Sequence, residues 1–210
     1  MPGELMAAAP SIKGSVLAGH AEALTKYLAS HPVDREVLAR RFPDGELAML
    51  AGPISAGAWY DLATYQRVLE FLRDHPGEGR NEYLLAAGTR SAEALIRAGF
   101  YQQMEYLRRT QHSRHDDRAE RFQAFGRDLR LLGTLTASIM NFADTSVQRD
   151  PDRADRWMLV YDCSAPFPDV LCWTTQGFCN RMAEEHGNPD LWRWVRQRPD
   201  LVQLRMQYSL

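Results

Sequence analysis

The chain has 210 residues, of which 45% are hydrophobic and 25% are charged, and its formal net charge is −2. These values are typical of a globular protein with one medium-sized domain, long enough to bury a core. A near-neutral charge, with arginine spread along the sequence, offers no basic surface for nucleic acid. The N-terminus lacks the cationic and apolar regions of a signal peptide, and the apolar runs fall short of the roughly 20 residues of a membrane span. We therefore expect a cytoplasmic protein with no membrane span and no nucleic-acid partner.

The first elements in chain order are helices. Leucines recur at helical spacing over residues 14–29, and the proline after this segment ends the helix. Two short helices are predicted over residues 34–42 and 44–50, each with an aspartate, Asp34 or Asp44, at its N-cap.

A second strong helical pattern follows. Leu62, Tyr65, Leu69 and Leu72 form one apolar stripe, which ends before Pro76–Gly77. Two further helices are predicted over about residues 81–98 and 100–109, followed by a polar linker at 109–118. After the linker, an apolar stripe predicts another helix that ends near Gly133; the stripe consists of Phe122, Phe125, Leu129 and Leu132.

Alternation with period two then replaces the helical period. Val202, Leu204, Met206, Tyr208 and Leu210 alternate with polar residues, which predicts a half-buried antiparallel strand. Three further strands are predicted over residues 136–150, 156–164 and 191–197. In the strand at 156–164, one face carries Trp157, Leu159, Tyr161 and Cys163. A helix from Pro168 to Gly187 separates the first pair of strands from the second.

This order of elements predicts an α+β fold, in which an N-terminal helical layer packs on a C-terminal antiparallel four-stranded sheet with the order ββαββ. We expect a single domain over residues 1–210, with a helical part at about 12–133 and a sheet part at about 134–210.

The three cysteines, Cys163, Cys172 and Cys179, are too few and too irregular for a disulfide framework, which favours a reducing compartment. Cys172 and Cys179 are seven residues apart, so two helical turns, about 10.8 Å, separate them. Neither one tetrahedral zinc ion nor one disulfide spans that distance. We interpret the pair as small residues on a buried helix face. Redox or metal chemistry stays open only if Cys163 meets Cys172 from the neighbouring strand.

The histidines suggest two further alternatives. His112 and His115, with Asp116, have a spacing that suits a metal on a helix, but their polar surroundings favour a solvated linker. His20, on or beside the apolar face of the first helix, is either a core or boundary residue or an axial haem ligand, and we favour the first. We predict no metal site.

The aromatic residues are the remaining candidates. Trp59, Tyr60 and Tyr65 suit a pocket lining, although aromatic residues at helical spacing usually belong to the core. Trp192 and Trp194 share one strand face, which is core if a helix covers it and a ligand or partner surface if it is open. The sequence has no G-x-S-x-G, P-loop or G-x-G-x-x-G motif. We therefore predict no catalytic residue and no enzymatic activity.

Taken together, several segments resemble an uncharacterised bacterial family related to the superfamily of haem–nitric-oxide-binding, 4-vinyl-reductase and TRAPP-subunit proteins. The resemblance covers nearly the whole chain, through "SIKGSVLAGHAEALTKYL", "ISAGAWYDLATYQRVLEFL", "GTRSAEALIRAGFY" and "CWTTQGFCNRMAEEHGNPDLWRWV". Its most specific part is the helix with Gln176–Gly177–Phe178, followed by a hairpin. The resemblance implies that this helix packs on the sheet, and that helices and sheet enclose an apolar pocket or form a partner surface.

Members of that superfamily bind haem, small aromatic effectors or an acyl chain, according to branch. The Tyr-x-Ser-x-Arg motif of the haem branch is absent here, and the last strand lacks the cysteines of the 4-vinyl-reductase branch.

Three functional hypotheses follow. The first is a non-catalytic regulatory or scaffold domain acting through protein–protein contacts, as a homodimer or with another partner. The second is a sensor that binds a small apolar or aromatic ligand between helices and sheet, without any other cofactor. Haem binding is the third and is disfavoured. The residues proposed for the pocket or partner surface are Trp59, Tyr60, Tyr65, Trp173, Phe178, Trp192 and Trp194.

Overall fold

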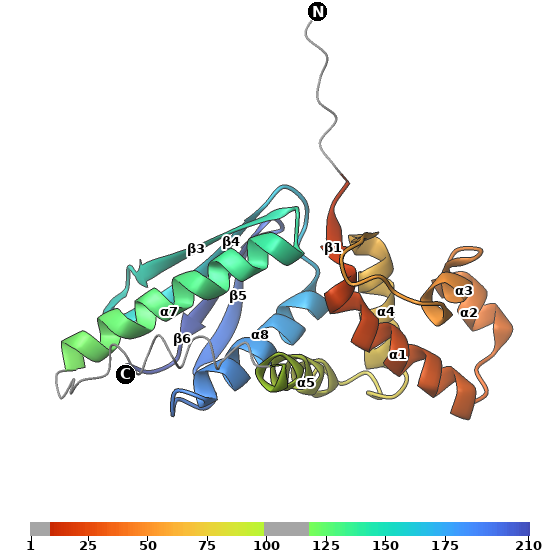
Figure 1. Cartoon of the computed structure of the whole chain (residues 1–210), viewed down its shortest axis with the longest axis horizontal. Helices are drawn as coiled ribbons and strands as arrows, with labels where there is room; N and C mark the ends of the chain where they lie inside the picture. The colour runs from red at the N-terminus through yellow and green to blue at the C-terminus, as the bar shows by residue number, and fades with distance from the viewer. Residues whose placement is uncertain (1–8, 99–117) are drawn as a thin grey trace, which may run out of the picture.

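A four-stranded antiparallel sheet and seven helices make up most of the computed structural model, which describes residues 9–98 and 118–210 (Figure 1). The helices are α1 (Gly14–Ser30), α2 (Arg35–Arg41), α3 (Glu46–Ala51), α4 (Leu62–Asp74), α5 (Glu82–Arg97), α7 (Arg118–Ile139) and α8 (Asp169–Glu184). The strands are β1 (Ser11–Lys13), β2 (Trp59–Asp61), β3 (Ala143–Asp150), β4 (Arg153–Cys163), β5 (Trp192–Arg198) and β6 (Leu201–Met206). The class is therefore α+β, as predicted.

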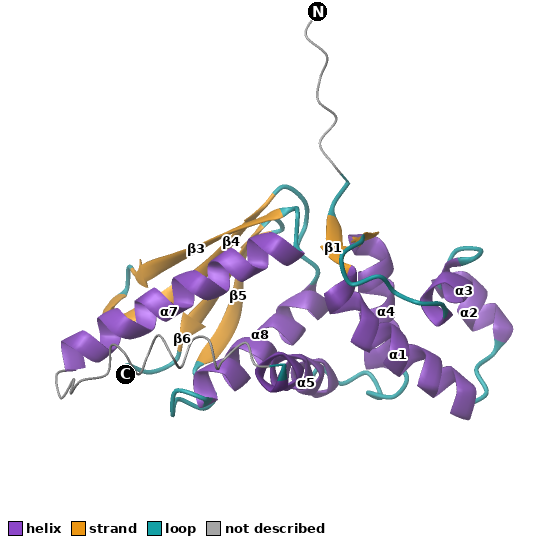
Figure 2. Cartoon of the chain, in the orientation of Figure 1, coloured by secondary structure: helices purple, strands orange, loops and turns teal. Residues whose placement is uncertain are grey.

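The sheet has the strand order β3-β4-β6-β5, and all its pairs are antiparallel (Figure 2). One face is apolar because the strands alternate as the sequence indicates. The residues of β4 and β6 that point to this inner face, Trp157, Leu159, Tyr161, Cys163, Val202, Leu204 and Met206, are all buried.

Two helices cover the inner face. The Trp157 ring of β4 stacks on Phe122 of α7 at 4.7 Å, and its Nε1 donates to the Phe122 carbonyl at 2.9 Å. Gly126 makes this approach possible, since a Cβ there would lie 2.3 Å from the Trp157 ring. α8 lies beside β5, and Figure 1 shows it between the sheet and the N-terminal helices.

Helices α1, α3 and α4 pack on one another, whereas α5 packs mainly on α8, which α4 also contacts. The short strands β1 and β2 pair next to α1 and α4. The α3–α4 contact is polar: the buried carboxylate of Glu46 accepts hydrogen bonds from Arg67 (2.5 and 2.9 Å) and from Thr64 (2.5 Å). Burial alone would raise the Glu46 pKa, but these hydrogen bonds hold it below its usual value. The sheet is therefore covered by α7 and α8 rather than by the whole helical layer.

Most predicted helices and strands are confirmed. The stripe of Leu62, Tyr65, Leu69 and Leu72 is buried, and Asp34 caps α2 by accepting from the Glu36 amide at 2.8 Å. The chain order of two strands, one helix and two strands is also confirmed. The predicted helix over 100–109, the linker at 109–118, and His112, His115 and Asp116 lie outside the described residues.

Four local predictions are wrong. The helix expected to end near Gly133 continues to Ile139, and the strand expected from residue 136 begins at Ala143. Gly133 lies in the helix where it passes β3, since a Cβ there would contact Thr145 at 3.6 Å. Gly45, at a φ of 80°, is the N-cap of α3 instead of Asp44. The last strand ends at Met206, beyond which Tyr208 is 37% exposed.

Among the described helices, none has the length and apolar character that crossing a membrane requires.

Candidate functional site

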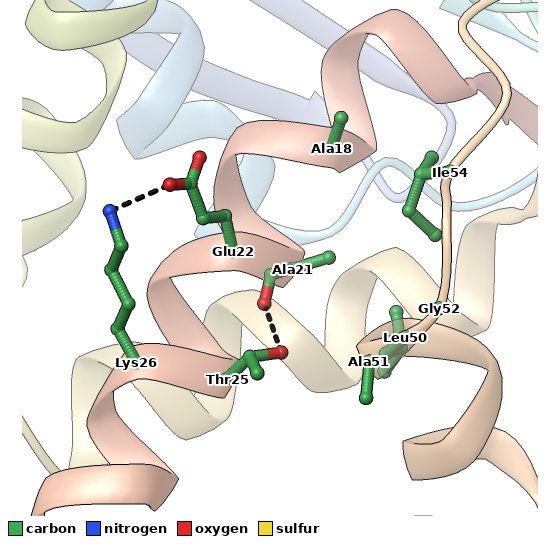
Figure 3. A pocket seen from close by; sticks show the side chains of 9 residues that line it. All are labelled: Ala18, Ala21, Glu22, Thr25, Lys26, Leu50, Ala51, Gly52 and Ile54. Carbon is green, nitrogen blue, oxygen red and sulfur yellow. Dashed lines mark hydrogen bonds and ion pairs between the residues drawn. The ribbon is translucent and has the colours of Figure 1, made fainter.

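A pocket of about 250 Å³ lies between α1 and the end of α3. Figure 3 shows side chains of α1 on one side and Leu50, Ala51, Gly52 and Ile54 on the other. The lining residues are Ala18, Ala21, Glu22, Thr25, Lys26, Leu50, Ala51, Gly52 and Ile54.

Small residues on one face of α1 create this space. Ala18, Ala21 and Thr25 recur at helical spacing, so a shallow surface faces the end of α3. Across the pocket, Leu50 is buried and Ile54 is half-buried. The hydrogen bonds of Glu46 described above fix α3 on α4, which holds this wall in place. The wall is therefore mainly apolar and formed by two separate segments of chain.

The rim of the pocket is polar. Glu22 and Lys26 form an exposed i,i+4 ion pair at 2.6 Å, and this pair lowers the Glu22 pKa through its hydrogen bond and charge. The Thr25 hydroxyl donates to the Ala21 carbonyl at 2.9 Å, which leaves the hydroxyl oxygen free to accept only. An apolar body inside and a polar group at the rim match an amphipathic ligand.

His20 lies on the other side of α1, about 200° of helical rotation from Ala18. It is 7% exposed, and its ring meets the ring of Tyr65 edge-on at 5.4 Å. Its Nδ1 is 3.2 Å from the Val16 carbonyl and 3.5 Å from the Tyr65 hydroxyl. Burial lowers the His20 pKa, and the charge of Arg90 adds to this effect. His20 is thus a neutral core histidine and does not line the pocket.

The three cysteines lie in the core around Tyr161. Cys172 and Cys179 are on the buried face of α8, and all three thiols are free, which confirms the helix-face interpretation. Burial raises the pKa of each thiol to about 12. Tyr161 is hydrogen-bonded with Cys179, and burial raises its pKa well above the usual value. In residues 9–98 and 118–210, no group of three or more potential metal ligands comes together.

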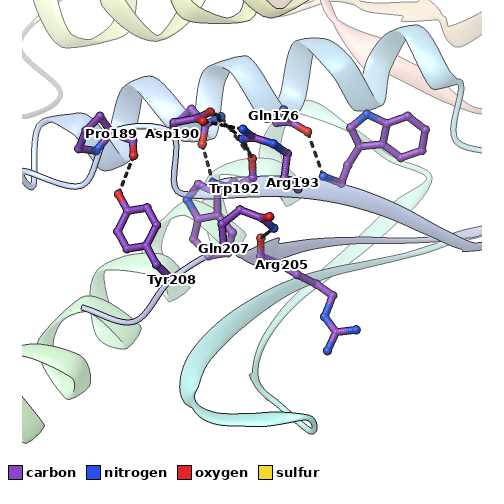
Figure 4. A network of polar contacts seen from close by, with 10 residues as sticks. Gln176, Pro189, Asp190, Trp192, Arg193, Arg205, Gln207 and Tyr208 are labelled. Atoms are coloured by element: carbon purple, nitrogen blue, oxygen red, sulfur yellow. Dashed lines mark hydrogen bonds and ion pairs between the residues drawn. The ribbon is translucent and has the colours of Figure 1, made fainter.

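α8 is joined to the edge strand β5 by side-chain amides (Figure 4). The Trp194 amide donates to Oε1 of the buried Gln176 at 3.0 Å, and the Trp192 amide donates to Oδ1 of Asn180 at 2.6 Å. Asn180 Nδ2 returns a bond to the Trp192 carbonyl at 3.3 Å. Side chains of α8 thus occupy the positions that a further strand would take.

The aromatic residues predicted for a site are distributed over three places. Trp59 is 44% exposed on β2, where Lys13 Nζ lies 4.1 Å from its ring centre, and Tyr60 is half-buried beside it. Tyr65 is in the α1–α4 core, in contact with His20.

The other four lie on α8 and β5. Trp173 meets Trp194 edge-on at 5.4 Å, and Phe178 is half-buried. Trp192 is 1% exposed and stacks on Phe125 of α7 at 6.3 Å. The strand face of Trp192 and Trp194 therefore meets helices. None of the seven predicted aromatics lines the α1–α3 pocket.

The residues that line this pocket are not among those predicted from the sequence. Alanine, leucine and isoleucine carry no chemical signature, and about thirty positions separate the two walls. The available signal was the run of small residues at positions 18, 21 and 25 on one face of a strongly predicted helix.

Comparisons with known proteins show a likeness in fold to one solved structure. No family model and no curated protein matches this sequence. Among solved structures, the chain is similar to an H-NOX protein from S. oneidensis in the Fe(II)NO ligation state, with a TM-score of 0.51 and 12% sequence identity. The match covers 95% of this chain and 100% of that chain. At this identity the likeness concerns the fold alone, which resembles that of this haem–nitric-oxide-binding protein.

Proposed function

We propose that this chain is a regulatory sensor domain, whose α1–α3 pocket binds a small amphipathic ligand. The pocket itself is the observation that carries the proposal. Supporting it, a fold like that of an H-NOX protein extends over 95% of the chain. The expected site between helices and sheet is here replaced by one within the helical part.

The size of the pocket limits the ligand. An engineered apolar cavity of about 150 Å³ is known to hold benzene. A volume of 250 Å³ therefore suits one ring with a substituent, or a short alkyl chain with a polar head. It lies just below the usual range for ligand sites, about 300–1,000 Å³. Because Lys26 lies at the rim in an exposed ion pair with Glu22, a carboxylate or hydroxyl that shares the Lys26 ammonium is the favoured polar group.

Haem does not fit this pocket. Haem iron takes its axial ligand from histidine, cysteine, methionine or tyrosine. None of these is among the nine residues that line the pocket. His20 lies on the opposite face of α1, as its helical rotation from Ala18 indicates. We therefore assign no step of the function to haem in this pocket.

A thermal-shift screen with indole, phenol, benzoate and hexanoate tests the proposal. A ligand at one hundred times its Kd stabilises the folded state by about 2.7 kcal/mol. For a chain of this size, that raises the Tm by roughly 5–10 °C. Absence of any shift with all four compounds at millimolar concentration would contradict the proposal.

Two matched variants locate the binding. Ala18→Phe fills the pocket and is expected to weaken binding of a hit at least tenfold in calorimetry. Ala29→Phe adds the same ring to an exposed position of α1 outside the pocket and is expected to leave the Kd unchanged. Equal Kd values for the wild type and Ala18→Phe would place binding elsewhere.

Protein–protein contact is the second candidate function. The observation that favours it is the outer edge of β3, which pairs with no other described strand.

A further inference from the structure

The two edges of the sheet differ. At the β5 edge, Gln176 and Asn180 of α8 bond the outward amides of Trp194 and Trp192. At the other end of β5, Arg196 bonds Asp169 at the start of α8 and the Phe167 carbonyl, at 2.5 and 2.6 Å. α8 therefore runs along the β5 edge and is attached at both of its ends, so no further strand can add there.

The hydrogen-bond pattern shows which groups of β3 point outward. The Trp157 amide of β4 points toward β6, where it meets Met206, and the Ser164 amide points toward β3, where it bonds the Phe142 carbonyl. Orientation alternates along an antiparallel strand. The even-numbered residues of β4 therefore bond β3.

The register then assigns the groups of β3. Ser146 lies opposite Val160, and Gln148 lies opposite Met158, so these residues bond β4. The amides and carbonyls of Thr145, Val147 and Arg149 consequently point away from the sheet. In the part of the chain that the structure describes, no hydrogen bond satisfies these outward groups.

The β3 edge also lacks most of the usual protections. Natural edge strands are commonly kept short or carry proline, lysine or a bulge. β3 has eight residues without proline or lysine, and its register shift comes only at Arg149/Asp150. The Asp150 carboxylate is buried and bonded by Arg205, so this end of the strand is held in place. β3 is thus a long, ordered strand whose outward donors and acceptors have no hydrogen-bond partner among the described residues, although α7 passes near the Thr145 carbonyl at Gly133.

We propose that β3 pairs antiparallel with β3 of a second copy of this chain, about a two-fold axis through Ser146. The two sheets then form one sheet of eight strands, within the usual range of sheet size. This register places Asp144 opposite Gln148 of the second copy and Arg149 opposite Ala143, so no like charges face each other. Thr145 and Val147 then bond their counterparts in the second copy.

A second copy is favoured over an open chain of copies because, in the described residues, the four-stranded sheet has one edge without hydrogen-bond partners. With β5 closed by α8, pairing at β3 uses the remaining edge of both partners. The interface is isologous and produces a closed dimer, the commonest oligomer of soluble proteins, rather than a fibre. Both α7 helices lie on the same face of the joined sheet.

Light scattering after gel filtration tests this dimer with two variants of one residue. The wild type is expected at twice the monomer mass of 24.0 kDa at micromolar concentration. Val147→Pro removes one outward amide and leaves the bonds to β4, since proline is tolerated at edge positions whose amide faces outward. It is expected to be monomeric, whereas Val147→Ala loses a similar apolar contact, keeps the amide and is expected to remain dimeric. A monomeric wild type at 100 µM, or a dimeric Val147→Pro variant, overturns the proposal.

Hydrogen exchange of the wild type gives a second readout that needs no variant. The amides of Thr145 and Val147 are expected to exchange slowly at high protein concentration and quickly on dilution. The amides of Ser146 and Gln148, bonded to β4, are expected to be protected at both concentrations. Fast exchange of Thr145 and Val147 at the concentration where the protein is dimeric would place the interface elsewhere. Because β3 lies outside the α1–α3 pocket, this result is independent of ligand binding.

Discussion

Single residues decide how much chemistry the core can perform. A thiol reacts as its thiolate, and the thiols of Cys163, Cys172 and Cys179 have a pKa raised to about 12 by burial. Arg196 Nη2 lies 3.5 Å from the Cys172 sulfur and favours its thiolate, yet burial has the larger effect. At neutral pH these cysteines therefore act as small apolar side chains.

Titration with Ellman's reagent checks this assignment. The native protein at pH 7.5 is expected to show no fast-reacting thiol. After unfolding in guanidinium, which is roughly twice as strong a denaturant as urea, all three thiols are expected to react. Rapid reaction of one thiol in the native protein would contradict the assignment of all three cysteines as unreactive. The variant Cys163→Ala would then show whether that thiol is Cys163, which is the most exposed of the three at 7%.

His20 gives a pH dependence with a definite sign. Because burial lowers its pKa in the folded state, the unfolded chain binds the proton more readily. The stabilisation from neutral His20 is complete above about pH 6.5, the pKa of an unperturbed histidine. It is lost as the pH falls from there through the lowered pKa. Urea unfolding at pH 7.5 and 5.0 is expected to show a larger loss of stability in the wild type than in His20→Leu. An equal loss would mean that folding does not lower the His20 pKa.

At the scale of elements, the closest contact is the crossing of α5 and α8. A Cβ at Gly88 would lie 1.9 Å from the Thr174 carbonyl oxygen, and a Cβ at Gly177 would lie 2.0 Å from that of Leu85. The two backbones touch because both helices have glycine at the crossing. This contact joins the N-terminal helices to the sheet through α8.

Alanine substitutions test this crossing. Gly88→Ala and Gly177→Ala are each expected to destabilise the protein by about 1–3 kcal/mol or more, because the helices must move apart. Gly19→Ala is the control: Gly19 is exposed on α1 with nothing within 4 Å, so the variant is expected to gain roughly 0.5–1 kcal/mol from helix propensity. Denaturant midpoints measure all three. A neutral effect at both Gly88 and Gly177 would show that α5 and α8 do not touch there.

Periodicity predicted the elements well where one face is apolar, as in α4, β4 and β6. It failed where a tertiary contact sets the boundary. Gly133 resembles a helix end, but α7 continues past it, and this part of the helix packs against β3. Tyr208 continues the alternation of β6, yet it leaves the sheet and donates to the Pro189 carbonyl at 2.6 Å. The sequence around Gly133 or Tyr208 does not show which distant residues each will contact in the fold.

On the scale of the whole molecule, the helices α1–α4 lie at one end and the sheet with α7 at the other, with α8 between (Figure 1). The candidate pocket is at the helical end and the free edge of β3 is at the sheet end. The sequence predicted the fold class because hydrophobic pattern determines it. The sequence did not predict the pocket, because the pocket depends on the distance between α1 and α3. The predicted aromatic residues lie elsewhere, on β2, in the α1–α4 core, and on α8 and β5.

The most direct test of the ligand-binding account is an NMR titration of the ¹⁵N-labelled protein with the strongest compound of the screen. If the ligand binds in the α1–α3 pocket, the largest amide shifts are expected at Ala18, Ala21, Leu50 and Ile54. The amide signals of Trp173, Trp192 and Trp194 are expected to stay unchanged. Shifts centred on α8 and β5, or no saturable shifts at all, would contradict binding in this pocket.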